Sequence, residues 1–391
     1  MKIRELKPIF ALGFCAFLMI LAEFAPISLL SNIAKTLKTE PNVIGLSVSI
    51  YAIAGATFGL LFSLIFNKFN RKVLFIVIFI LLFIGNTAIL YSDNIIEFFI
   101  FRFLCAVGHG IFWAVVVDFS IKLVEVENRS IASSIIFSSI PIATITGLPI
   151  LNYIGNQLNW QLSFSLISLC CILCLLLIIF FIPNINTEIE NEPIVLKNLL
   201  KNKFAWSLIA VTAMVSTAHF CSYTYIEPYV RQLSFFSNSH LLMVFLIFGV
   251  SGIFGNIITM KFMNKYIAKM TFIFLFLMIS SLFLIYYIGN EISFYGYLLL
   301  IFLWGVSISI LFTSLQTWVV VVSNKSSAIM AAFNSAILNY SIGLGSILGA
   351  GIISKFDIIW LFFCSSIFLL IALIQLFNSL KNNKKYRNKL S

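Results

Sequence analysis

The sequence predicts an all-α integral membrane protein with twelve transmembrane helices in two six-helix halves. Only 10% of its 391 residues are charged, whereas about a quarter are charged in a typical soluble domain. Apolar stretches of about 20 residues, long enough to cross a bilayer at about 1.5 Å per residue, recur along nearly the whole chain. The longest polar stretch, residues 183–203, separates them into two groups of six.

Short polar breaks rich in Lys, Arg, Asn, Gly and Pro separate the predicted spans. The first span follows Lys2, Arg4 and Lys7, as the apolar region of a signal peptide would. It is too long for one and lacks a small-residue cleavage site, so we expect it to remain as a helix. The predicted spans are 8–30, 44–66, 73–91, 96–121, 131–154, 162–183, 204–230, 240–260, 270–289, 294–320, 327–350 and 358–380.

The positive residues are sorted between the two sides of the membrane. If the N-terminus is cytoplasmic, 20 of the 25 Lys and Arg residues fall on cytoplasmic segments. Lys35, Lys38, Arg231 and Lys355 fall outside, and Arg102 falls within a span. This bias follows the positive-inside rule and predicts that both termini are cytoplasmic. The net charge of +11 then has a topological origin, and we expect no nucleic-acid partner.

Two related halves are indicated by the sequence itself. We expect an N-terminal half at 1–183, a cytoplasmic linker at 184–203, and a C-terminal half with a short basic tail at 204–391. Shifting the sequence by 196 residues aligns small, aromatic and polar residues at equivalent places in corresponding spans, which indicates duplication. The aligned pairs are Ala22 with Ala218, Phe24 with Phe220, Gly59 with Gly255, Arg129 with Lys325, Ser130 with Ser326, Gly147 with Gly343 and Gly155 with Gly351.

Ionisable residues inside the spans are few and unevenly distributed. A charge at the bilayer centre costs about 2.5–3.5 kcal/mol, and each Leu, Ile or Phe returns about 0.3–0.6 kcal/mol, so one charge per span is tolerated. Their distribution is more informative, because those that fall within the hydrocarbon region, away from the span ends, occur only in the first, fourth and seventh spans, which are equivalent members of successive three-helix groups. They are Glu23, Arg102, His109, Asp118, His219 and Glu227.

Helical spacing groups these residues in the N-terminal half. At about 100° per residue, Arg102, His109 and Trp113 fall within about 40° of one another and form one stripe. Glu23 and Arg102 both lie about 10 Å below the outer end of their helices, so we expect their side chains to be able to pair. Burial favours the proton-bound form of a carboxyl group, and a nearby cation opposes it, so Glu23 is a candidate proton carrier. The alternatives are a structural carboxyl group and a static ion pair.

The seventh span places polar residues in an apolar run, "AHFCSYTYIEPYVRQL". His219, Ser222 and Tyr223 share one face of the predicted helix, as expected of residues that line a solute path. Glu227 lies about 80° away. It is followed at i+4 by Arg231, so it either takes part in proton coupling or forms an ordinary exposed ion pair.

Other chemistries have little support in the sequence. Cys171 and Cys174 have the spacing of metal ligands, but no second pair or nearby His completes a site, so we expect them to pack as small apolar residues. Neither H-E-x-x-H nor G-x-S-x-G is present, and we expect no enzyme and no metal. A membrane sensor without transport would need an output domain, for which no sequence is left.

Five stretches resemble the sugar efflux transporters of the major facilitator superfamily, the bacterial arabinose and thiogalactoside exporters. A parallel repeat of six and six helices is the layout of that superfamily. The stretches with the most specific match are those of the first and seventh spans. The matching stretches are "AEFAPISLLSNIA", "HGIFW", "GLP" with "LNWQ", "AHFCSYTYIEP" and "LQTWV".

The resemblance implies proton-driven export of sugars or sugar-like solutes by alternating access, across a bacterial inner membrane, by a monomer that needs no cofactor besides the proton gradient. A multidrug/proton antiporter of the same fold is the alternative, because aromatic walls also suit planar drugs. The proton-coupling candidates are Glu23, Arg102, His109 and Glu227, and the substrate-binding candidates are Trp113, His219, Tyr223, Trp304, Gln316 and Asn339.

Two superfamily signatures are only partly retained. The loop between the second and third spans, usually G-x-x-x-D-R-x-G-R-K, here reads "SLIFNKFNRK" and keeps Arg71, Lys72 and a conservative Lys68 as gating candidates. Asn67 replaces the gating aspartate. Asp118, another gating candidate, is expected either to supply the missing charge or to form a salt bridge with the lysine four residues later. The fifth span keeps the Gly and Pro of "GLP" from the antiporter signature, and its glycines are expected to serve helix packing.

Overall fold

The chain forms two compact units, Met1–Glu192 and Pro193–Ser391. The division falls within the predicted linker. Residues 189–201 of that linker and 382–391 of the predicted basic tail lie outside the described residues. The computed structural model describes residues 3–65, 68–188, 202–289, 291–323 and 327–381, except for a few side chains at the edges of these ranges.

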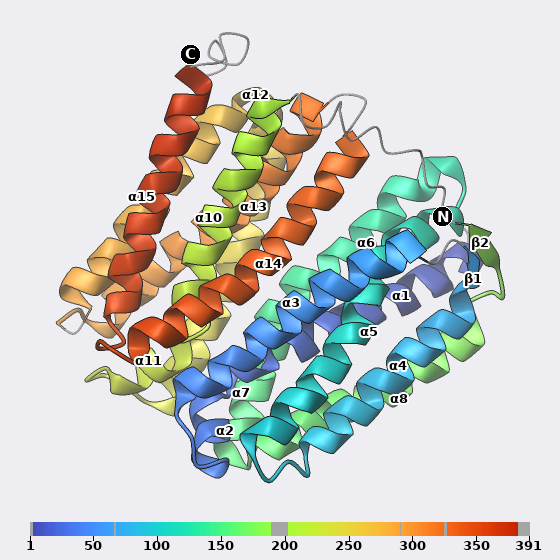
Figure 1. Cartoon of the computed structure of the whole chain (residues 1–391), viewed down its shortest axis with the longest axis horizontal. Helices are drawn as coiled ribbons and strands as arrows, with labels where there is room; N and C mark the ends of the chain where they lie inside the picture. Colours follow the sequence, from blue (N-terminus) through green and yellow to red (C-terminus); the bar gives the residue numbers. More distant parts are fainter. Residues whose placement is uncertain (1–2, 66–67, 189–201, 290, 324–326, 382–391) are drawn as a thin grey trace. The chain divides into compact units, whose positions relative to one another are not determined.

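Twelve described helical segments are long and apolar enough to span a membrane, as predicted. Figure 1 shows the helices of each unit running side by side. The first unit contains α1 (Ile3–Phe24), α3 (Pro41–Ile65), α4 (Arg71–Ile89), α5 (Ile95–Lys122), α6 (Arg129–Ile142) continued by α7 (Leu148–Gln157), and α8 (Trp160–Phe181). The second contains α10 (Lys203–Tyr223), α12 (Asn238–Ile288), α13 (Phe294–Ser323), α14 (Ser327–Ile353) and α15 (Trp360–Lys381).

The first span ends earlier than predicted. The α-helix stops at Phe24 and is followed by a 3₁₀ turn, η1 (Ala25–Ser28), and a short helix, α2 (Leu30–Thr36). Pro26 explains the break, because its nitrogen carries no hydrogen for the helical bond to the carbonyl of Ala22. The carbonyl of Ala22 can therefore accept a hydrogen bond from another group.

The seventh span breaks in the same way. Here α10 ends at Tyr223, and a second short helix, α11 (Ile226–Gln232), follows. Helices α2 and α11 each contain 7 residues, and the shift of 196 residues that aligns the two sequence halves carries residues 30–36 onto 226–232. The repeat seen in the sequence therefore extends to the position of a helix break.

Two other spans depart from regular separate helices. The element α12 contains two of the predicted spans, Asn238–Met263 and Lys265–Ile288, and the backbone between them leaves helical geometry at Tyr266, where φ is −129° and ψ is 30°, within the break predicted between residues 260 and 270. The segment contains good helix formers, Lys and Met, and lacks Pro and Gly, so the break between the two helices is short. In the fifth span, a π-helical turn, η3 (Ala143–Gly147), follows Pro141 and joins α6 to α7.

A short sheet, not predicted from the sequence, ties the loop after α3 to the start of the linker. Strand β1 (Lys68–Asn70) pairs antiparallel with β2 (Asn186–Glu188). The amide of Arg71 donates to the carbonyl of Ile185 at 3.3 Å, which continues the contact. Strands of 3 residues carry too little periodicity to be recognised in a sequence.

Small residues let α3 and α5 approach closely. A Cβ atom at Gly110 would overlap the carbonyl oxygen of Gly55, and one at Gly59 would lie 2.8 Å from the carbonyl oxygen of Gly110. Transmembrane helices that pack on glycine bring their backbones together and gain van der Waals contact along the seam. This packing holds Tyr51 of α3 against His109 of α5.

Replacing Gly110 with Ala is expected to destabilise the first unit by about 1–3 kcal/mol, because the added methyl group must push two backbones apart. Gly252→Ala is the matched control, because no heavy atom of a neighbour lies within 4 Å of a Cβ built there. The thermal midpoint of the detergent-solubilised protein, followed by size-exclusion chromatography, should fall for Gly110→Ala only. Equal midpoints for the two variants would contradict the close approach of α3 and α5.

In the second unit, glycines likewise allow α14 and α10 to approach closely. A Cβ at Gly345 would lie 2.5 Å from the carbonyl oxygen of Thr217, and one at Gly349 would lie 2.7 Å from that of Cys221. Gly345 and Gly349 therefore let α14 pack closely against α10. Similarly, Gly305 of α13 lies against Ser251 of α12.

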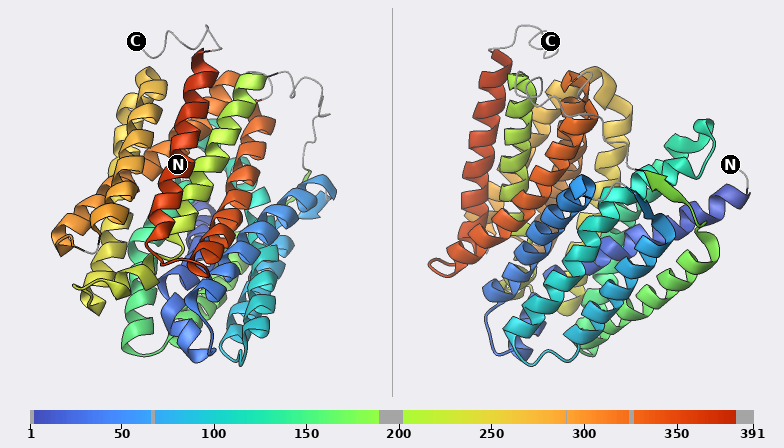
Figure 2. Two further views of the ribbon diagram at one scale, coloured as in Figure 1. Left: turned by 60° about the vertical axis from the view of Figure 1, so that its left-hand side comes forward. Right: turned by 45° about the vertical axis from the view of Figure 1, so that its right-hand side comes forward.

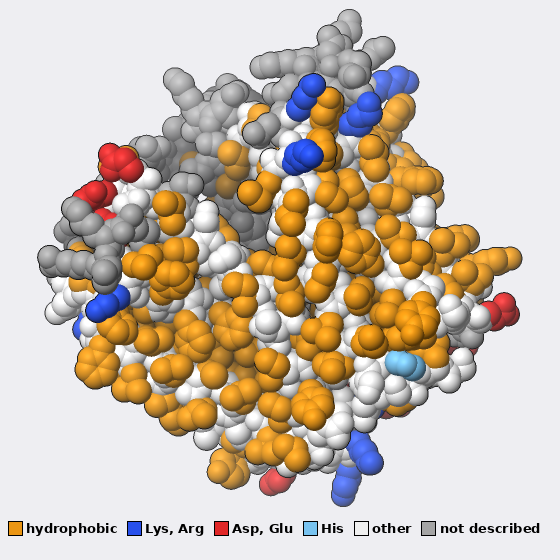
Figure 3. Space-filling view, turned by 180° about the vertical axis from the view of Figure 1, so that it is seen from behind, with side chains coloured by type: hydrophobic (Ala, Val, Ile, Leu, Met, Phe, Trp, Pro, Cys, Tyr) orange, Lys and Arg blue, Asp and Glu red, His pale blue; other side chains and the backbone are white. Residues whose placement is uncertain are grey.

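Apolar side chains cover the outside of the helices, as a lipid environment requires. Exposed large apolar residues occur along the helices, among them Val77, Ile179, Phe276 and Ile374. Hydrophobic side chains dominate the face in Figure 3, and its Lys, Arg, Asp and Glu side chains lie near the margins. Further views in Figure 2 show the helices of each unit from two other directions.

Candidate functional site

The first unit contains a buried group of polar side chains, the N cluster, formed by Glu23, Tyr51, Arg102 and His109. Their exposed fractions are 3%, 0%, 0% and 5% respectively. Glu23 comes from the last turn of α1, Tyr51 from α3, and the other two from α5. The structure thus brings together three of the ionisable residues that the sequence singled out and adds a tyrosine.

Of the roles left open for Arg102, the static ion pair with the side chain of Glu23 is not formed in the structure. The guanidinium of Arg102 donates instead to two backbone carbonyls, of Ala22 at 2.5 Å and of Glu23 at 2.7 Å. The end of α1 explains this choice, because Pro26 leaves the carbonyl of Ala22 without its helical donor. Arg102 therefore caps the broken helix and holds a positive charge close to the carboxyl group of Glu23.

The carboxyl group of Glu23 lies against a histidine. Its Oε2 is 3.5 Å from Nε2 of His109. Glu23 Oε1 and His109 Nδ1 are both buried, and neither has a hydrogen-bond partner among the described residues. Buried polar atoms normally have partners, so an open position on each group is typical of a site that exchanges a proton or receives a ligand.

Tyr51 completes the N cluster and was not identified from the sequence. The guanidinium of Arg102 lies 4.1 Å from the centre of the Tyr51 ring, a cation–π contact. His109 meets the same ring edge-on, with centroids 5.0 Å apart. In the sequence, Tyr51 is distinguished only by its position one turn before Gly55 in a predicted span. Many residues have such a position, so this signal is too common to select it.

The predicted stripe on α5 continues to Trp113. Its ring is tilted against that of His109, with centroids 6.3 Å apart, and stacks on Phe137 of α6 at 6.5 Å. Trp113 is half-buried, in contrast to the N cluster. It therefore extends the buried polar group toward an aromatic surface.

The second unit contains an aromatic group around His219, the C cluster, formed with Tyr223, Phe248, Trp304 and Phe312. The imidazole stacks on Tyr223 at 5.0 Å and on Phe248 at 5.9 Å between centroids. Trp304 and Phe312 meet it edge-on at 5.5 Å and 5.9 Å. Three helices contribute, α10, α12 and α13, and the two phenylalanines were not among the predicted site residues.

A hydrogen bond determines which nitrogen of the His219 ring carries the hydrogen. The indole Nε1 of Trp304, which is fully buried, donates to Nδ1 of His219 at 3.1 Å. An imidazole nitrogen that accepts a hydrogen bond carries no proton, so the neutral ring has its hydrogen on Nε2. His219 thus offers one N–H donor within an otherwise aromatic wall.

Three polar residues predicted near this site are held elsewhere. Ser222 was expected to share the face of His219, but its hydroxyl lies 2.8 Å from that of Ser365 in α15. The side chain of Gln316 accepts a short hydrogen bond from Asn334 of α14. Asn339 donates to the backbone of its own helix at 3.0 Å. Gln316 therefore contacts a neighbouring helix, and Asn339 bonds within its own helix.

Glu227 forms the predicted pair with Arg231, but the pair is not an ordinary exposed one. The side chain of Glu227 has no exposed surface, and that of Arg231 is 22% exposed. The carboxyl group belongs to the short helix α11, which follows the break in α10, and it is fully buried. A buried acid with a partly exposed cation remains a proton-coupling candidate.

At the other end of α5, Asp118 pairs with Lys122 at 3.0 Å, and both are substantially exposed. Asp118 also interacts electrostatically with Arg71, the first residue of α4. The position of Asp118 is therefore compatible with supplying a negative charge to the gate motif. Its exposed pair with Lys122 alone contributes little stability.

The remaining gating candidates lie near the short sheet. Lys72 donates to the carbonyl of Ile179 at 2.6 Å and so joins α4 to the end of α8. The backbone of Lys68 belongs to β1, but its side chain lies outside the described residues, as does Asn67.

Cysteines do not form a metal site in the part of the chain that the structure describes. No group of three or more His, Cys, Asp or Glu side chains is placed to hold a metal ion among these residues. Cys171 and Cys174 are buried free thiols in α8. Their spacing reflects one face of a helix packed into the unit.

Comparisons with known proteins agree on the fold. Two structures of a bacterial homolog of the human lysosomal transporter Spinster match with 14% identity. The inward-facing occupied form has a TM-score of 0.75 and covers 98% of both chains, and the inward-facing unoccupied form has a TM-score of 0.74 and covers 97% of both. The nucleoside transporter NupG matches with a TM-score of 0.72 and 14% identity over 96% of this chain and 99% of its own.

These identities show likeness of fold alone. The family model described as Major Facilitator Superfamily matches residues 12–339, most of the chain. With twelve membrane-spanning segments in two units and this match, the chain belongs to the major facilitator superfamily and is a multi-pass membrane protein.

Proposed function

We propose that this protein is a secondary active transporter that exports sugars or sugar-like small solutes by proton antiport through alternating access. Its superfamily membership supports a transporter rather than an enzyme. The observation that carries the proposal is the buried pair of Glu23 and His109, 3.5 Å apart, in a chain with few ionisable residues in its spans. Intramembrane carboxyl groups of this kind are typical of proton relays.

The N cluster is the proposed proton site. Release of a proton from Glu23 leaves a carboxylate beside His109 and near the fixed positive charge of Arg102, and uptake of a proton removes it. The charge of a buried group therefore changes by one unit between the two states. Such a change alters the free energy of burial by several kcal/mol, which is enough to bias two conformations of a transporter.

The C cluster is the proposed solute site. It combines broad aromatic faces with a single directed N–H donor on His219, and ligand sites are typically built from many apolar groups and a few placed polar ones. The apolar faces of a sugar ring suit stacking on Tyr223 and Trp304, and its hydroxyls suit the donor. The resemblance of the α10 segment to sugar exporters supports the same assignment.

A multidrug antiporter is the second candidate. The observation in its favour is the density of rings around His219, where Phe248 and Phe312 add surface without hydrogen-bonding groups. Planar lipophilic compounds would bind such a surface as well as sugars do. The two functions differ in substrate breadth.

We further propose that the membrane is a bacterial inner membrane with both termini on the cytoplasmic side. The unequal distribution of Lys and Arg supports this orientation. A monomer is the proposed transporting unit, because each unit of the chain carries one of the two clusters.

Efflux of radiolabelled arabinose and a thiogalactoside from cells that express the protein tests the function. We expect efflux that a protonophore abolishes and that falls at least about tenfold in the double variant His219→Ala/Tyr223→Ala, a loss of about 1.4 kcal/mol. His240→Ala is the matched control, because His240 belongs to neither cluster and stacks on Phe294. Absence of sugar efflux with protection against several unrelated lipophilic cations would instead favour the multidrug function.

A further inference from the structure

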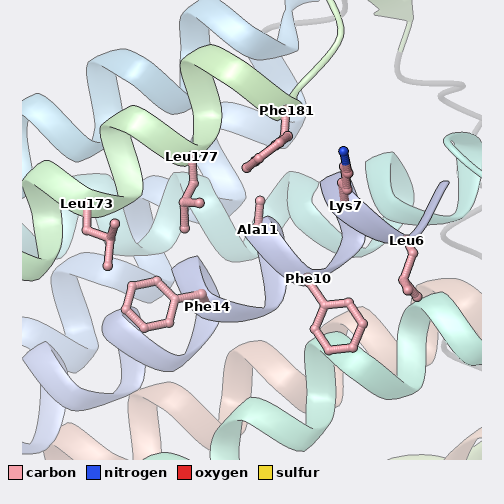
Figure 4. A pocket seen from close by; sticks show the side chains of 8 residues that line it. All are labelled: Leu6, Lys7, Phe10, Ala11, Phe14, Leu173, Leu177 and Phe181. Carbon is pink, nitrogen blue, oxygen red and sulfur yellow. The ribbon is translucent and has the colours of Figure 1, made fainter. Parts of the chain in front are cut away.

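An apolar groove runs between α1 and α8 on the first unit, away from the N cluster. Its volume is about 420 Å³, within the range of about 300–1,000 Å³ typical of ligand sites. Figure 4 shows Lys7 and Phe181 toward one end, and Phe14 and Leu173 toward the other. The residues that line most of it are Leu6, Lys7, Phe10, Phe14, Leu177 and Phe181.

The groove is open to the surroundings of the protein. Phe10 is 56% exposed and Phe181 is 38% exposed, although both are large apolar side chains. Both helices span the membrane, so the open side of the groove meets lipid where it lies within the bilayer. An elongated apolar ligand is the chemistry that this lining accepts.

Among the described residues that line this groove, Lys7 is the one that carries a charge. Its Nζ lies 5.8 Å from the centre of the Phe181 ring, and it forms no hydrogen bond or ion pair with any described residue. The nearest acid in sequence, Glu5, points elsewhere and accepts hydrogen bonds from the amide of Glu125 and the side chain of Asn128, each at 3.2 Å. The described residues therefore supply no counter-ion to this cation.

A second lysine lies at the same end of α8. Lys72 donates to the carbonyl of Ile179, two residues before Phe181. Two ammonium groups thus flank the end of a helix whose surface forms the groove. Basic pockets between transmembrane helices on the cytoplasmic side are suited to anionic lipid head groups.

We propose that this groove is a binding site for an anionic phospholipid, with one acyl chain along α1 and α8 and the phosphate paired with Lys7. The apolar lining matches the chain, and the ammonium group of Lys7, which has no ion-pair partner among the described residues, matches the head group. In the orientation proposed above, this end of the unit lies in the cytoplasmic leaflet, where anionic lipids provide the negative charge. The proposal does not depend on the transported solute or on proton coupling.

Lipid binding to the purified, delipidated protein tests the proposal by native mass spectrometry. Phosphatidylglycerol and phosphatidylcholine with the same two oleoyl chains are titrated separately. We expect phosphatidylglycerol to bind in preference, and Lys7→Gln to lower its affinity about fivefold with little effect on phosphatidylcholine. Lys355→Gln, which removes an exposed lysine of the second unit, should change neither.

A second variant tests the chain-binding part of the site. Leu177→Trp fills the groove and should reduce the occupancy of both lipids, while a monodisperse size-exclusion profile shows that the protein remains folded. Equal binding of the two lipids by the wild-type protein, or no effect of Lys7→Gln, would overturn the proposal. Binding of inorganic phosphate alone at Lys7 would also overturn the proposal, because free phosphate would then be the ligand. So would a dimer of the wild-type protein that is lost in Leu177→Trp, because a second copy of the chain would then occupy the groove.

Discussion

Replacing Glu23 with Gln is expected to abolish proton coupling while solute exchange continues. The substitution keeps the shape of the side chain but removes the group that gains and loses a proton beside His109. In proteoliposomes, a pH difference of about one unit can sustain about a tenfold solute gradient at one proton per solute. The variant should sustain no gradient, so the accumulation ratio should fall about tenfold, to near one.

Two further measurements make this result specific. Exchange of labelled for unlabelled solute without a pH difference should persist in Glu23→Gln, which shows that the protein still moves solute. Glu291→Gln is the matched control, because it removes an exposed carboxyl group outside both clusters and should retain full coupling. Full coupling in Glu23→Gln would exclude Glu23 as the proton carrier and leave His109 and Glu227 as the acids to test.

Replacing Trp304 with Phe is expected to weaken solute binding about tenfold and to leave proton coupling intact. Phenylalanine keeps an aromatic ring in the wall but cannot donate to Nδ1 of His219. A buried nitrogen then loses its partner, at a cost of about 1–3 kcal/mol, and the imidazole can rotate or change its tautomer. The N–H donor offered to the solute is no longer held in one direction.

Nitrogen-15 NMR of the labelled imidazoles tests this mechanism without measuring transport. The wild-type protein should show His219 as the neutral tautomer with hydrogen on Nε2, and Trp304→Phe should lose this unique state. Trp318→Phe is the matched control on the same helix, because Trp318 is 1% exposed and packs edge-on against Phe204, away from His219. An unchanged tautomer with weaker solute binding would assign Trp304 a packing role only.

Helix prediction succeeded because the bilayer leaves the backbone few alternatives. Every polar group of the main chain must be bonded within the membrane, so long apolar stretches become helices whatever their tertiary contacts. The ends of the helices were less predictable. Pro26 ended the first helix within its apolar stretch, whereas the break between the two spans of α12 narrowed to a kink at Tyr266.

The ionisable residues of the candidate site were predicted from the sequence, whereas three of its aromatic residues, Tyr51, Phe248 and Phe312, were not. Glu23 and His109 are conspicuous because ionisable side chains are rare within the spans, and the structure places them in contact. Tyr51 and Phe248 are equally important to the geometry of the clusters, but they are two of 13 tyrosines and 42 phenylalanines. No periodicity distinguishes a ring that contacts a functional group from one that contacts lipid.

The sequence by itself determined that this protein spans the membrane twelve times, that its two halves are related, and which few ionisable residues lie in its spans. Hydrophobicity and residue type are local properties, so they can be read without knowing what a side chain contacts. Only the tertiary structure decided that Arg102 bonds the carbonyls at the end of α1, that Glu23 lies against His109, and that Trp304 orients His219. Partners depend on where a helix breaks and how closely two helices pack, and both are set by contacts between residues far apart in the chain.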